Sequence, residues 1–281
     1  MKRASVIGAG TMGASIAQVF AAADYRVTLA DVSMEYAQKG KMSIENRLLS
    51  LVQKGKIDDV KMKKMLSGIV VTDCLQSCKD SEIIIEAVAE NMQLKQKIFS
   101  ELEEFAGQDT LLVSNTSSLS VTEIASVLER PERFLGMHFF NPASVMHLVE
   151  VISGEHTGEK YVERTMEIAD NIGKTPVMVK ESAGFVVNRI LIPMINEAIG
   201  VYAEGVANIQ DIDTAMKLGA NHPMGPLALG DLVGLDVVLD IMQILQSETG
   251  EDKYRPHPLL RKMVRAGKLG KKTKIGFYDY H

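Results

Sequence analysis

Apolar residues in the first two thirds of the chain form short runs, separated by stretches in which they recur at helical spacing. Runs such as Arg3–Ile7, Tyr25–Ala30 and Ile83–Val88 are rich in β-favouring residues and predict strands. Similar runs predict strands at 69–72, 111–114, 134–139 and 148–152. Helical spacing predicts helices at 12–23, 34–54, 59–67, 93–105 and 122–128. This alternation predicts an α/β fold, with a mostly parallel sheet and helices on both faces.

The pattern changes beyond about residue 183. Helical periodicity predicts helices at 185–203, 209–218, 235–248 and 258–266, with no strand among them. We therefore expect two domains. Residues 1–183 form the sheet domain, and residues 184–281 form a smaller all-helical domain.

The uncharged run Ala4–Ala23 follows Lys2 and Arg3 and superficially resembles a secretion signal. It begins like a strand, contains regularly placed glycines and includes polar residues such as Gln18. We therefore expect it to belong to the fold, in a cytoplasmic protein that does not cross a membrane.

Composition excludes several classes of protein. The 46% hydrophobic and 24% charged residues are those of a soluble globular protein, and a net charge of −5 disfavours a nucleic-acid partner. Cys74 and Cys78 are the only cysteines, too few for a disulfide framework or a structural zinc site. We expect reduced thiols and no metal.

A glycine motif, G-x-G-x-x-G, occupies residues 8–13 directly after the first predicted strand and opens a helix. The first glycine permits a tight turn, the second lets the backbone approach a pyrophosphate, and the third lets helix and sheet pack closely. N–H groups at the helix N-terminus then face the phosphates. The motif predicts a Rossmann-type dinucleotide site. Its expected cofactor contacts are Gly8, Gly10, Thr11, Met12 and Gly13.

Asp31 ends the second predicted strand, 18 residues after Gly13, where a carboxylate can bond a ribose 2′-hydroxyl. The same carboxylate would repel a 2′-phosphate, and no arginine follows within Val32–Tyr36 to receive one. NAD is therefore the expected cofactor, rather than NADP.

Two predicted strands carry a candidate acid–base pair. His138 lies near the end of one, and Glu150 lies in the next. If these strands lie side by side, the carboxylate can hold the imidazole. Imidazole has an ordinary pKa of about 6.5, which suits it to exchanging an alcohol proton at neutral pH. The alternative is a buried histidine bonded to backbone and a glutamate on an exposed strand face.

Longer stretches of sequence resemble the 3-hydroxyacyl-CoA dehydrogenase family, most closely its short, monofunctional bacterial members that act on 3-hydroxybutyryl-CoA. The stretches span nearly the whole chain in family order: 6–13, 86–91, 114–119, 138–142, 148–151, 184–189, 267–270 and 276–278. This resemblance implies an oxidoreductase that interconverts (S)-3-hydroxybutyryl-CoA and acetoacetyl-CoA with NAD, in fatty-acid or butyrate metabolism.

The resemblance also implies roles for particular residues. His138 would take the hydroxyl proton, Glu150 would orient its ring, Ser117 would bond the 3-oxygen, and Asn188 would position substrate and histidine. The residues expected on the cofactor side are Glu90, Lys95 and Asn115. As alternatives, Ser117 and Asn115 could simply cap a helix or turn, and Asn188 could be a polar residue bonded between helices.

Coenzyme A carries phosphates, so its site needs cations. Arg47, Ser50 and Lys54 share one face of the predicted helix 34–54, and Lys56 follows it. We expect these four residues to bind the coenzyme A moiety, as the resemblance also suggests. The alternative is a solvated cationic helix face.

Two other functions are compatible with a dinucleotide site. Related dehydrogenases of free 3-hydroxy acids commonly use a catalytic lysine, and the presence of His138 and Glu150 argues against that function. A non-catalytic dinucleotide-binding protein would bind NADH without turnover.

Apolar faces in segments such as Leu235–Leu245 suggest a homodimer, as the family does. Lys274 stands where the family usually has glycine, so a side chain occupies a predicted turn.

Overall fold

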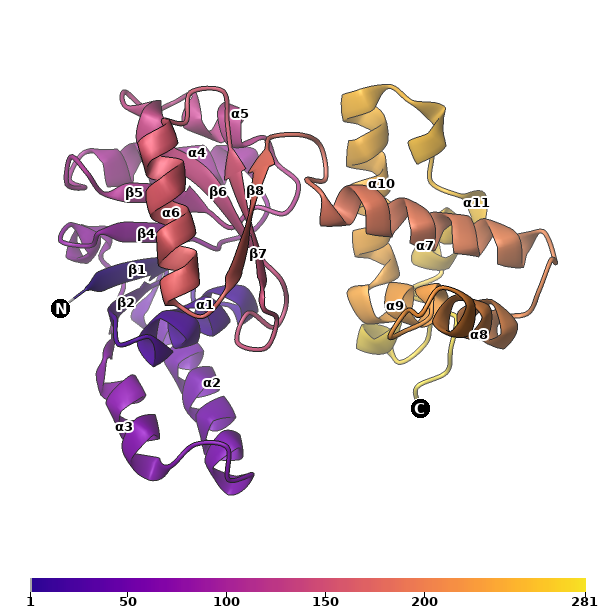
Figure 1. The fold of residues 1–281 in the computed structure, drawn as a ribbon, viewed down its shortest axis with the longest axis horizontal. Helices are drawn as coiled ribbons and strands as arrows, with labels where there is room; N and C mark the ends of the chain where they lie inside the picture. The colour runs from indigo at the N-terminus through magenta and orange to yellow at the C-terminus, as the bar shows by residue number, and fades with distance from the viewer. Residues whose placement is uncertain (1) are drawn as a thin grey trace. The chain divides into compact units, whose positions relative to one another are not determined.

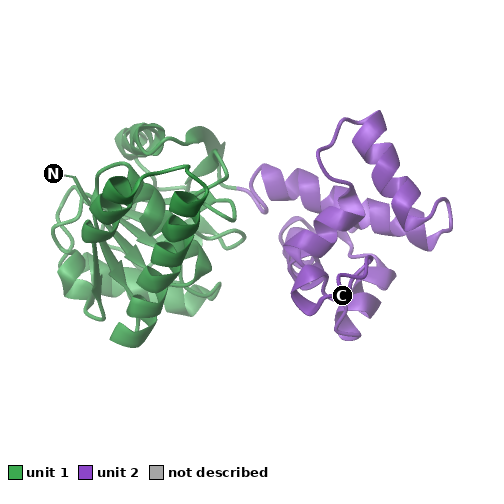
Figure 2. Ribbon diagram, turned by 90° about the horizontal axis from the view of Figure 1, so that it is seen from below, with its two compact units in different colours: residues 1–181 green, residues 182–281 purple. Residues whose placement is uncertain are grey.

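A computed structural model describes residues 2–281 of the chain (Figure 1). The chain divides into two compact units, residues 1–181 and residues 182–281, coloured separately in Figure 2. Each unit has its own apolar core.

The first unit is built on one eight-stranded sheet with the order β3-β2-β1-β4-β5-β6-β7-β8. Neighbouring strands are parallel, except for β6 and β7, which pair antiparallel. The strands are β1 (Arg3–Ile7), β2 (Arg26–Ala30), β3 (Ile69–Thr72), β4 (Ile83–Glu86), β5 (Leu111–Ser114), β6 (Phe134–Phe139), β7 (Leu148–Ser153) and β8 (Thr175–Lys180). The expected mostly parallel sheet is confirmed.

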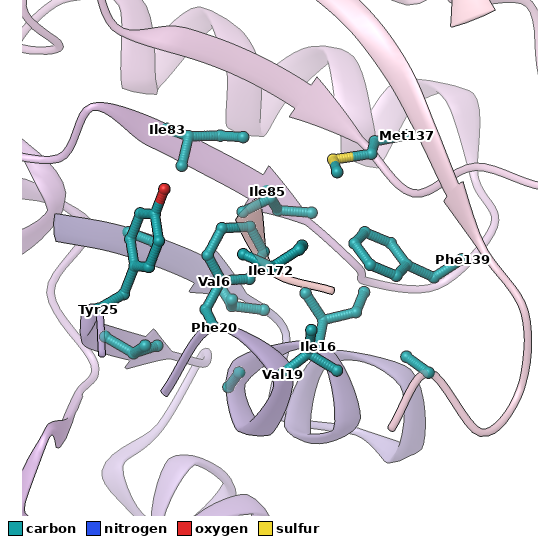
Figure 3. Packing of buried hydrophobic residues seen from close by; sticks show 14 of the residues in the cluster. Val6, Ile16, Val19, Phe20, Tyr25, Ile83, Ile85, Met137, Phe139 and Ile172 are labelled. Atoms are coloured by element: carbon teal, nitrogen blue, oxygen red, sulfur yellow. The ribbon is translucent and has the colours of Figure 1, made fainter. Parts of the chain in front are cut away.

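Helices cover both faces of this sheet. They are α1 (Thr11–Ala22), α2 (Met34–Gln53), α3 (Asp59–Ser67), α4 (Met92–Glu103), α5 (Val121–Ala125) and α6 (Glu159–Asn171), with short 3-10 helices η1 (Leu75–Cys78) and η2 (Pro131–Arg133). On one face, apolar residues of α1, α2 and α6 join the strands in a single core cluster, part of which Figure 3 shows. On the other face, Phe99 of α4 packs edge-on against Phe134 of β6, with ring centroids 4.7 Å apart.

Strand alternation decides which face each side chain of β6 and β7 occupies. Met137, Phe139, Val149 and Val151 belong to the core cluster under α1 and α6. Because successive side chains point to opposite faces, His138 and Glu150 point to the other face, which carries α4 and α5.

Most predicted elements are found within a residue or two of their expected ends. β4 stops at Glu86 rather than Val88, because the Glu86 carboxylate accepts the N–H of Val88 and turns the chain. Helix α6 and strand β8 are not among the elements expected from the pattern. β8 is the edge strand, contains Pro176 and is largely exposed, so it lacks a clear apolar run.

The apolar start of the chain forms β1 and α1, and most of it is buried in the core. Over residues 2–281, no helix is both long and apolar enough to cross a membrane. Cys74 and Cys78 are free thiols.

The second unit consists of α7 (Val187–Ala203), α8 (Ile209–Gly219), α9 (Pro226–Val233), α10 (Leu235–Thr249) and α11 (Pro258–Arg265), with 3-10 helices η3 (Asp252–Tyr254) and η4 (Lys271–Thr273). The pattern missed α9. It also began α7 two residues early, because Gly184 and Phe185 have positive φ angles of 72° and 53° that no α-helix accommodates. Five apolar side chains of α10 are buried in this unit's own core, namely Leu235, Val238, Ile241, Met242 and Leu245, whereas Val237 is 37% exposed. Most of the apolar face on which the homodimer expectation drew is therefore covered within the unit.

Two buried aspartates hold the C-terminal segment to this unit. Asp231 accepts hydrogen bonds from the N–H groups of Phe277 and Tyr278 and from the hydroxyl of Tyr280. Asp213 accepts from the hydroxyl of Tyr278 and from the first N–H groups of α9. Burial and the nearby Asp231 carboxylate raise the pKa of Tyr280 to about 12. The last residues of the chain are therefore part of the folded unit.

Lys274 lies in the turn that follows η4, with φ 60° and ψ 6°. This is the left-handed region, which costs a residue with a Cβ about 1–2 kcal/mol relative to glycine. The turn predicted from the sequence is present, and the lysine adopts the backbone that glycine would prefer.

We expect Lys274→Gly to stabilise the second unit by about 0.5–1 kcal/mol, because relief of the left-handed backbone exceeds the added freedom of the unfolded chain. Scanning calorimetry of the whole chain measures the change. The matched control is Lys268→Gly at an exposed lysine without positive φ, and it should lower stability. Equal losses in the two variants would show that residue 274 is not strained.

Candidate active site

The glycine turn connects β1 to α1 and leaves no room for a side chain at Gly8 or Gly13. Gly8 has φ 95° and its N–H donates to the carbonyl of Ala30 on β2. A Cβ at Gly13 would lie 1.7 Å from the carbonyl oxygen of Gly8, so turn and helix are in direct contact. No side chain caps the N-terminus of α1, whose first N–H groups at Thr11 and Met12 remain available to an anion.

Asp31 holds this turn from the end of β2. Its Oδ2 accepts the N–H of Ala9 at 2.6 Å, and its Oδ1 accepts the N–H of Val32 at 2.7 Å. The half-buried carboxylate is thus fixed beside the glycine turn, with further lone pairs for a ribose hydroxyl.

A cavity of about 500 Å³ opens over these residues. Its lining residues are Ala9, Gly10, Thr11, Asp31, Val32, Tyr36, Lys39, Gly40, Ser43 and Arg47. A Cβ at Gly10 would meet nothing within 4 Å, so the backbone there is open to a ligand. Turn, carboxylate and cavity therefore fit the nucleotide half of NAD.

Arg47 also lines this cavity, a position that the sequence pattern did not indicate. Its guanidinium donates to the hydroxyl of Ser43 at 3.4 Å, while its Nε is buried without a hydrogen-bond partner in the described chain. Burial lowers the pKa of Arg47. Ser50 lies further along α2, and the exposed Lys54 and Lys56 lie at and beyond its end, outside the cavity lining.

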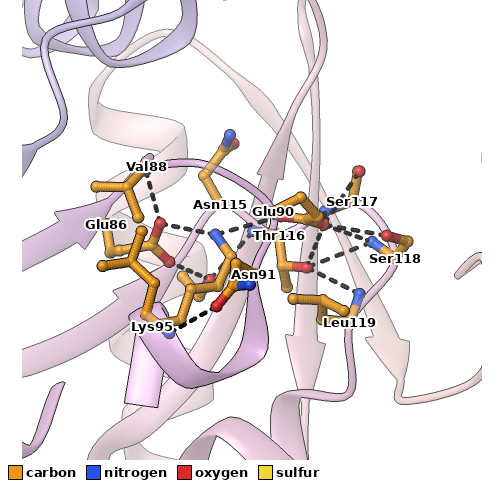
Figure 4. A network of polar contacts seen from close by, with 12 residues as sticks. Glu86, Val88, Glu90, Asn91, Lys95, Asn115, Thr116, Ser117, Ser118 and Leu119 are labelled. Atoms are coloured by element: carbon orange, nitrogen blue, oxygen red, sulfur yellow. Dashed lines mark hydrogen bonds and ion pairs between the residues drawn. The ribbon is translucent and has the colours of Figure 1, made fainter. Parts of the chain in front are cut away.

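A buried ionic network lies at the ends of β4 and β5 (Figure 4). The Nζ of Lys95, on α4, donates to Glu86 Oε1 at 2.7 Å and pairs with Glu90 Oε2 at 3.2 Å. Glu86 also accepts the hydroxyl of Ser114 at 2.7 Å. Lys95 is only 1% exposed, so its ammonium forms ion pairs with the two carboxylates and does not contact solvent.

Glu90 holds the loop that carries Ser117. One carboxylate oxygen accepts the hydroxyl of Thr116 at 2.6 Å and the N–H of Ser117 at 2.8 Å, and the hydroxyls of Ser117 and Ser118 also donate to it. Burial would raise the pKa of Glu90, but the Lys95 charge and the bonds from Thr116 and Ser117 outweigh it, so the pKa lies below its ordinary value.

Asn115 joins this loop to β6. Its side-chain oxygen accepts the N–H of Phe139 at 2.9 Å, and its own N–H donates to the carbonyl of Glu86. Glu90, Lys95, Asn115 and Ser117 are therefore brought together at one edge of the sheet, next to β6.

His138 and Glu150 are directly paired residues of the antiparallel strands β6 and β7. His138 Nδ1 lies 2.8 Å from Glu150 Oε2, and the two side chains are 8% and 1% exposed. The Phe140 ring packs on the imidazole, with centroids 4.5 Å apart. A buried imidazole held by a carboxylate at one nitrogen can exchange a proton at the other.

Asn188 lies in the first turn of α7, in the second unit. The expected site residues thus divide among the glycine turn, the Glu90 loop, the His138–Glu150 pair, helix α2 and the second unit. In residues 2–281, no cluster of three or more His, Cys, Asp or Glu side chains could hold a metal ion.

Sequence reasoning assigned no role to Glu86, Thr116, Tyr36 or Ser43. An acid at the end of an otherwise apolar strand was a signal for Glu86. Tyr36, Gly40, Ser43 and Arg47 recur at helical spacing along α2, which was a signal for the cavity wall.

The two glycines make separable predictions. Gly10→Ala should leave the melting temperature unchanged and weaken NADH binding about tenfold, because the added methyl meets only the ligand. Gly13→Ala should also destabilise the fold, by about 1–3 kcal/mol, because its Cβ overlaps the Gly8 carbonyl. Thermal unfolding and NADH fluorescence titration measure both. Unchanged NADH binding in Gly10→Ala would place the dinucleotide elsewhere.

Glu90 also predicts a pH dependence of stability. A carboxyl whose pKa is lowered by folding stabilises the protein above its unfolded pKa of about 4.5, and that contribution is lost as the pH falls through the folded pKa. The melting temperature should therefore fall less steeply below pH 4.5 in Glu90→Gln than in the native chain. Glu101→Gln, at an exposed position on α4, should keep the native slope. A native slope in Glu90→Gln would contradict the ion-pair network.

Comparison with known proteins agrees with this geometry. Residues 3–182 match the family description "3-hydroxyacyl-CoA dehydrogenase, NAD binding domain", and residues 184–280 match "3-hydroxyacyl-CoA dehydrogenase, C-terminal domain". The chain is 54% identical to a 3-hydroxybutyryl-CoA dehydrogenase of Clostridioides difficile, over 99% of both chains. It is 42% identical to the human mitochondrial hydroxyacyl-coenzyme A dehydrogenase, covering 100% of this chain and 91% of that one.

A solved structure is also similar. The crystal structure of (S)-3-hydroxybutyryl-CoA dehydrogenase from Ralstonia eutropha superposes with a TM-score of 0.97 at 44% identity, over 100% of this chain and 99% of that one. The dinucleotide fold, the cofactor cavity and these matches over both units lead to one conclusion. The chain is a member of the 3-hydroxyacyl-CoA dehydrogenase family and uses NAD.

Proposed function

We propose that this protein interconverts (S)-3-hydroxybutyryl-CoA and acetoacetyl-CoA, as a short-chain 3-hydroxyacyl-CoA dehydrogenase of fatty-acid or butyrate metabolism. The observation that carries the proposal is the hydrogen bond of 2.8 Å between His138 Nδ1 and Glu150 Oε2, on the same sheet as the NAD-type cavity. Relatives whose names give this activity cover nearly the whole chain.

In the proposed mechanism, His138 is the acid–base group. With Glu150 ionised, the Nδ1–H of the imidazole donates to the carboxylate, and Nε2 is the nitrogen that takes the proton of the substrate 3-hydroxyl. The buried carboxylate then stabilises the imidazolium without becoming protonated. In the direction of reduction, the imidazolium returns the same proton to the 3-oxygen.

Ser117 and Asn188 complete the proposed catalytic group. The hydroxyl of Ser117 would bond the 3-oxygen, and Asn188 would orient substrate and histidine. Glu90 supports the first assignment, because it accepts hydrogen bonds from the hydroxyl of Thr116 and from the backbone N–H groups of Ser117 and Ser118, which hold this loop. Orientation of this kind supplies several kcal/mol of a reaction barrier.

NAD, when bound, supplies the acceptor for the hydride that leaves C3 of the substrate. The residues proposed to hold it are Gly8, Gly10, Thr11, Met12, Gly13, Asp31, Glu90 and Asn115. Lys95 would act through Glu90, because its ammonium is buried between two carboxylates. Together these residues would orient the cofactor and exclude water from the face where the reaction occurs.

Coenzyme A is proposed to bind through Arg47, Ser50, Lys54 and Lys56. The unpaired, buried Nε of Arg47 supports an anion at the near end of this set, and the exposed lysines supply positive charge at the far end. Residues 1–183 would then form the cofactor domain, and residues 184–281 would form a domain for substrate binding and dimerisation.

The homodimer and the cytoplasmic location are also proposals. Ile190 and Leu218 are 68% and 81% exposed, and such apolar side chains of the second unit suit an interface between two copies.

The test is oxidation of NADH with acetoacetyl-CoA. We expect turnover with the CoA ester, and little with free acetoacetate or with NADPH. His138→Ala should lower kcat by about 100- to 10,000-fold, because proton transfer is lost. Glu150→Gln should lower kcat at least about 100-fold, because the imidazolium loses its counterion.

His156→Ala is the matched control, since this histidine of the same unit is exposed. It should keep the native kcat. Undiminished turnover in His138→Ala would remove the proposed acid–base group. NADH binding without turnover of any substrate would indicate a non-catalytic dinucleotide-binding protein.

A further inference from the structure

The loop between β6 and β7, residues 140–147, joins the two strands that carry His138 and Glu150. It begins with Phe140, whose ring packs on the His138 imidazole. Any shift of this loop would therefore move the ring contact and the strand register that together place the imidazole.

Lys174 holds this loop through its side chain. It lies in the turn between α6 and β8 and is only 8% exposed. Its Nζ donates to the carbonyl of Ala143 at 2.5 Å and to the carbonyl of Met146 at 2.8 Å. No carboxylate forms an ion pair with it in the described part of the chain.

A buried ammonium without a carboxylate is unusual, because desolvation disfavours the charged form. Burial indeed lowers the pKa of Lys174. Two backbone carbonyls of the loop are therefore the groups that stabilise its charge. A lysine kept only for solubility would instead reach solvent, as the exposed Lys180 on β8 does.

The same loop has further attachments. The N–H of Ser144 donates to the hydroxyl of Ser15 at 3.0 Å, and Ser15 is fully buried on α1, the helix that begins at the glycine turn. The side chain of Ala143 belongs to the core cluster. Thr175, next to Lys174, donates its N–H to the carbonyl of His147. The loop is thus fixed to α1 on one side and to the α6–β8 turn on the other.

We propose that Lys174 is a positioning residue for the His138–Glu150 pair, because its ammonium fixes the loop that sets strand register and the Phe140 contact. The inference rests on the proposed function of that pair. Lys174 itself touches neither substrate nor cofactor in this scheme.

The test compares Lys174→Met with Lys180→Met, the same substitution at an exposed lysine of the adjoining strand. Lys174→Met should lower kcat with acetoacetyl-CoA about 10- to 100-fold, because misplacement of a catalytic group by about 1 Å has effects of this size. The KM for NADH should stay within about twofold, since the glycine turn is untouched. Lys180→Met should keep native values.

The pH profile of kcat separates positioning from stability. If the imidazole–carboxylate bond loosens, the imidazolium is less stabilised, so the limb of the profile that reports it should move to lower pH in Lys174→Met. Loss of stability alone would lower the melting temperature and leave this limb in place. A native kcat and a native pH profile in a destabilised Lys174→Met would overturn the inference.

The position of the His138 ring can also be measured directly by NMR. In ¹⁵N-histidine-labelled protein, the Nδ1–H resonance of His138 should shift in Lys174→Met but not in Lys180→Met, with no substrate present. An unshifted resonance would refute the positioning role of Lys174. The absence of turnover with acetoacetyl-CoA would refute only the proposed function, because the resonance is measured without substrate.

If Lys174→Met does not fold, Ser15→Ala provides the test, because it removes the second attachment of the loop. This variant should lower kcat about two- to fivefold, and an unchanged kcat would count against the inference.

Discussion

The single antiparallel pairing in the sheet, between β6 and β7, is the constraint on which the site depends. Parallel strands bring their carboxyl ends to one edge, where an α/β sheet binds ligands. β6 ends there with His138 near its terminus, and β7 starts back from the same edge. Only this reversal places Glu150 opposite His138. A parallel β7 would have carried the acid to the far edge.

Buried charge at the neighbouring strand ends gives this edge its rigidity. Lys95 bridges Glu86 and Glu90, and Glu90 in turn accepts the N–H and hydroxyl groups of the Ser117 loop. Asn115 connects the loop to β6 through the N–H of Phe139. A chain of satisfied polar groups in a low-dielectric interior resists small displacements, and catalysis by orientation needs that resistance.

In the second unit, buried carboxylates that accept hydrogen bonds order the C-terminal segment. Asp213 and Asp231 are buried, yet each accepts hydrogen bonds from the C-terminal segment, so the segment is ordered by the fold that it completes. The strained backbone of Lys274 lies within this segment. The anchored residues Phe277, Tyr278 and Tyr280, which follow the turn, hold it in place although Lys274 is not a glycine.

The sequence by itself determined the elements with a strong local pattern. The glycine turn, the strands β1, β3, β5 and β6 and the helix α3 were predictable, because apolar period and backbone chemistry act over a few residues. The edge strand β8 was not, since an exposed strand with Pro176 lacks that period. The local pattern indicated the glycine turn, Asp31 and the candidate pair of His138 and Glu150, and the family resemblance supplied the other catalytic and cofactor-side residues. Only the tertiary structure decided which groups these residues contact. The hydrogen bond between His138 and Glu150, the burial of Lys95 between two acids and the place of Arg47 in the cavity each bring together residues of different elements. Such contacts depend on strand order and packing, which no local pattern encodes.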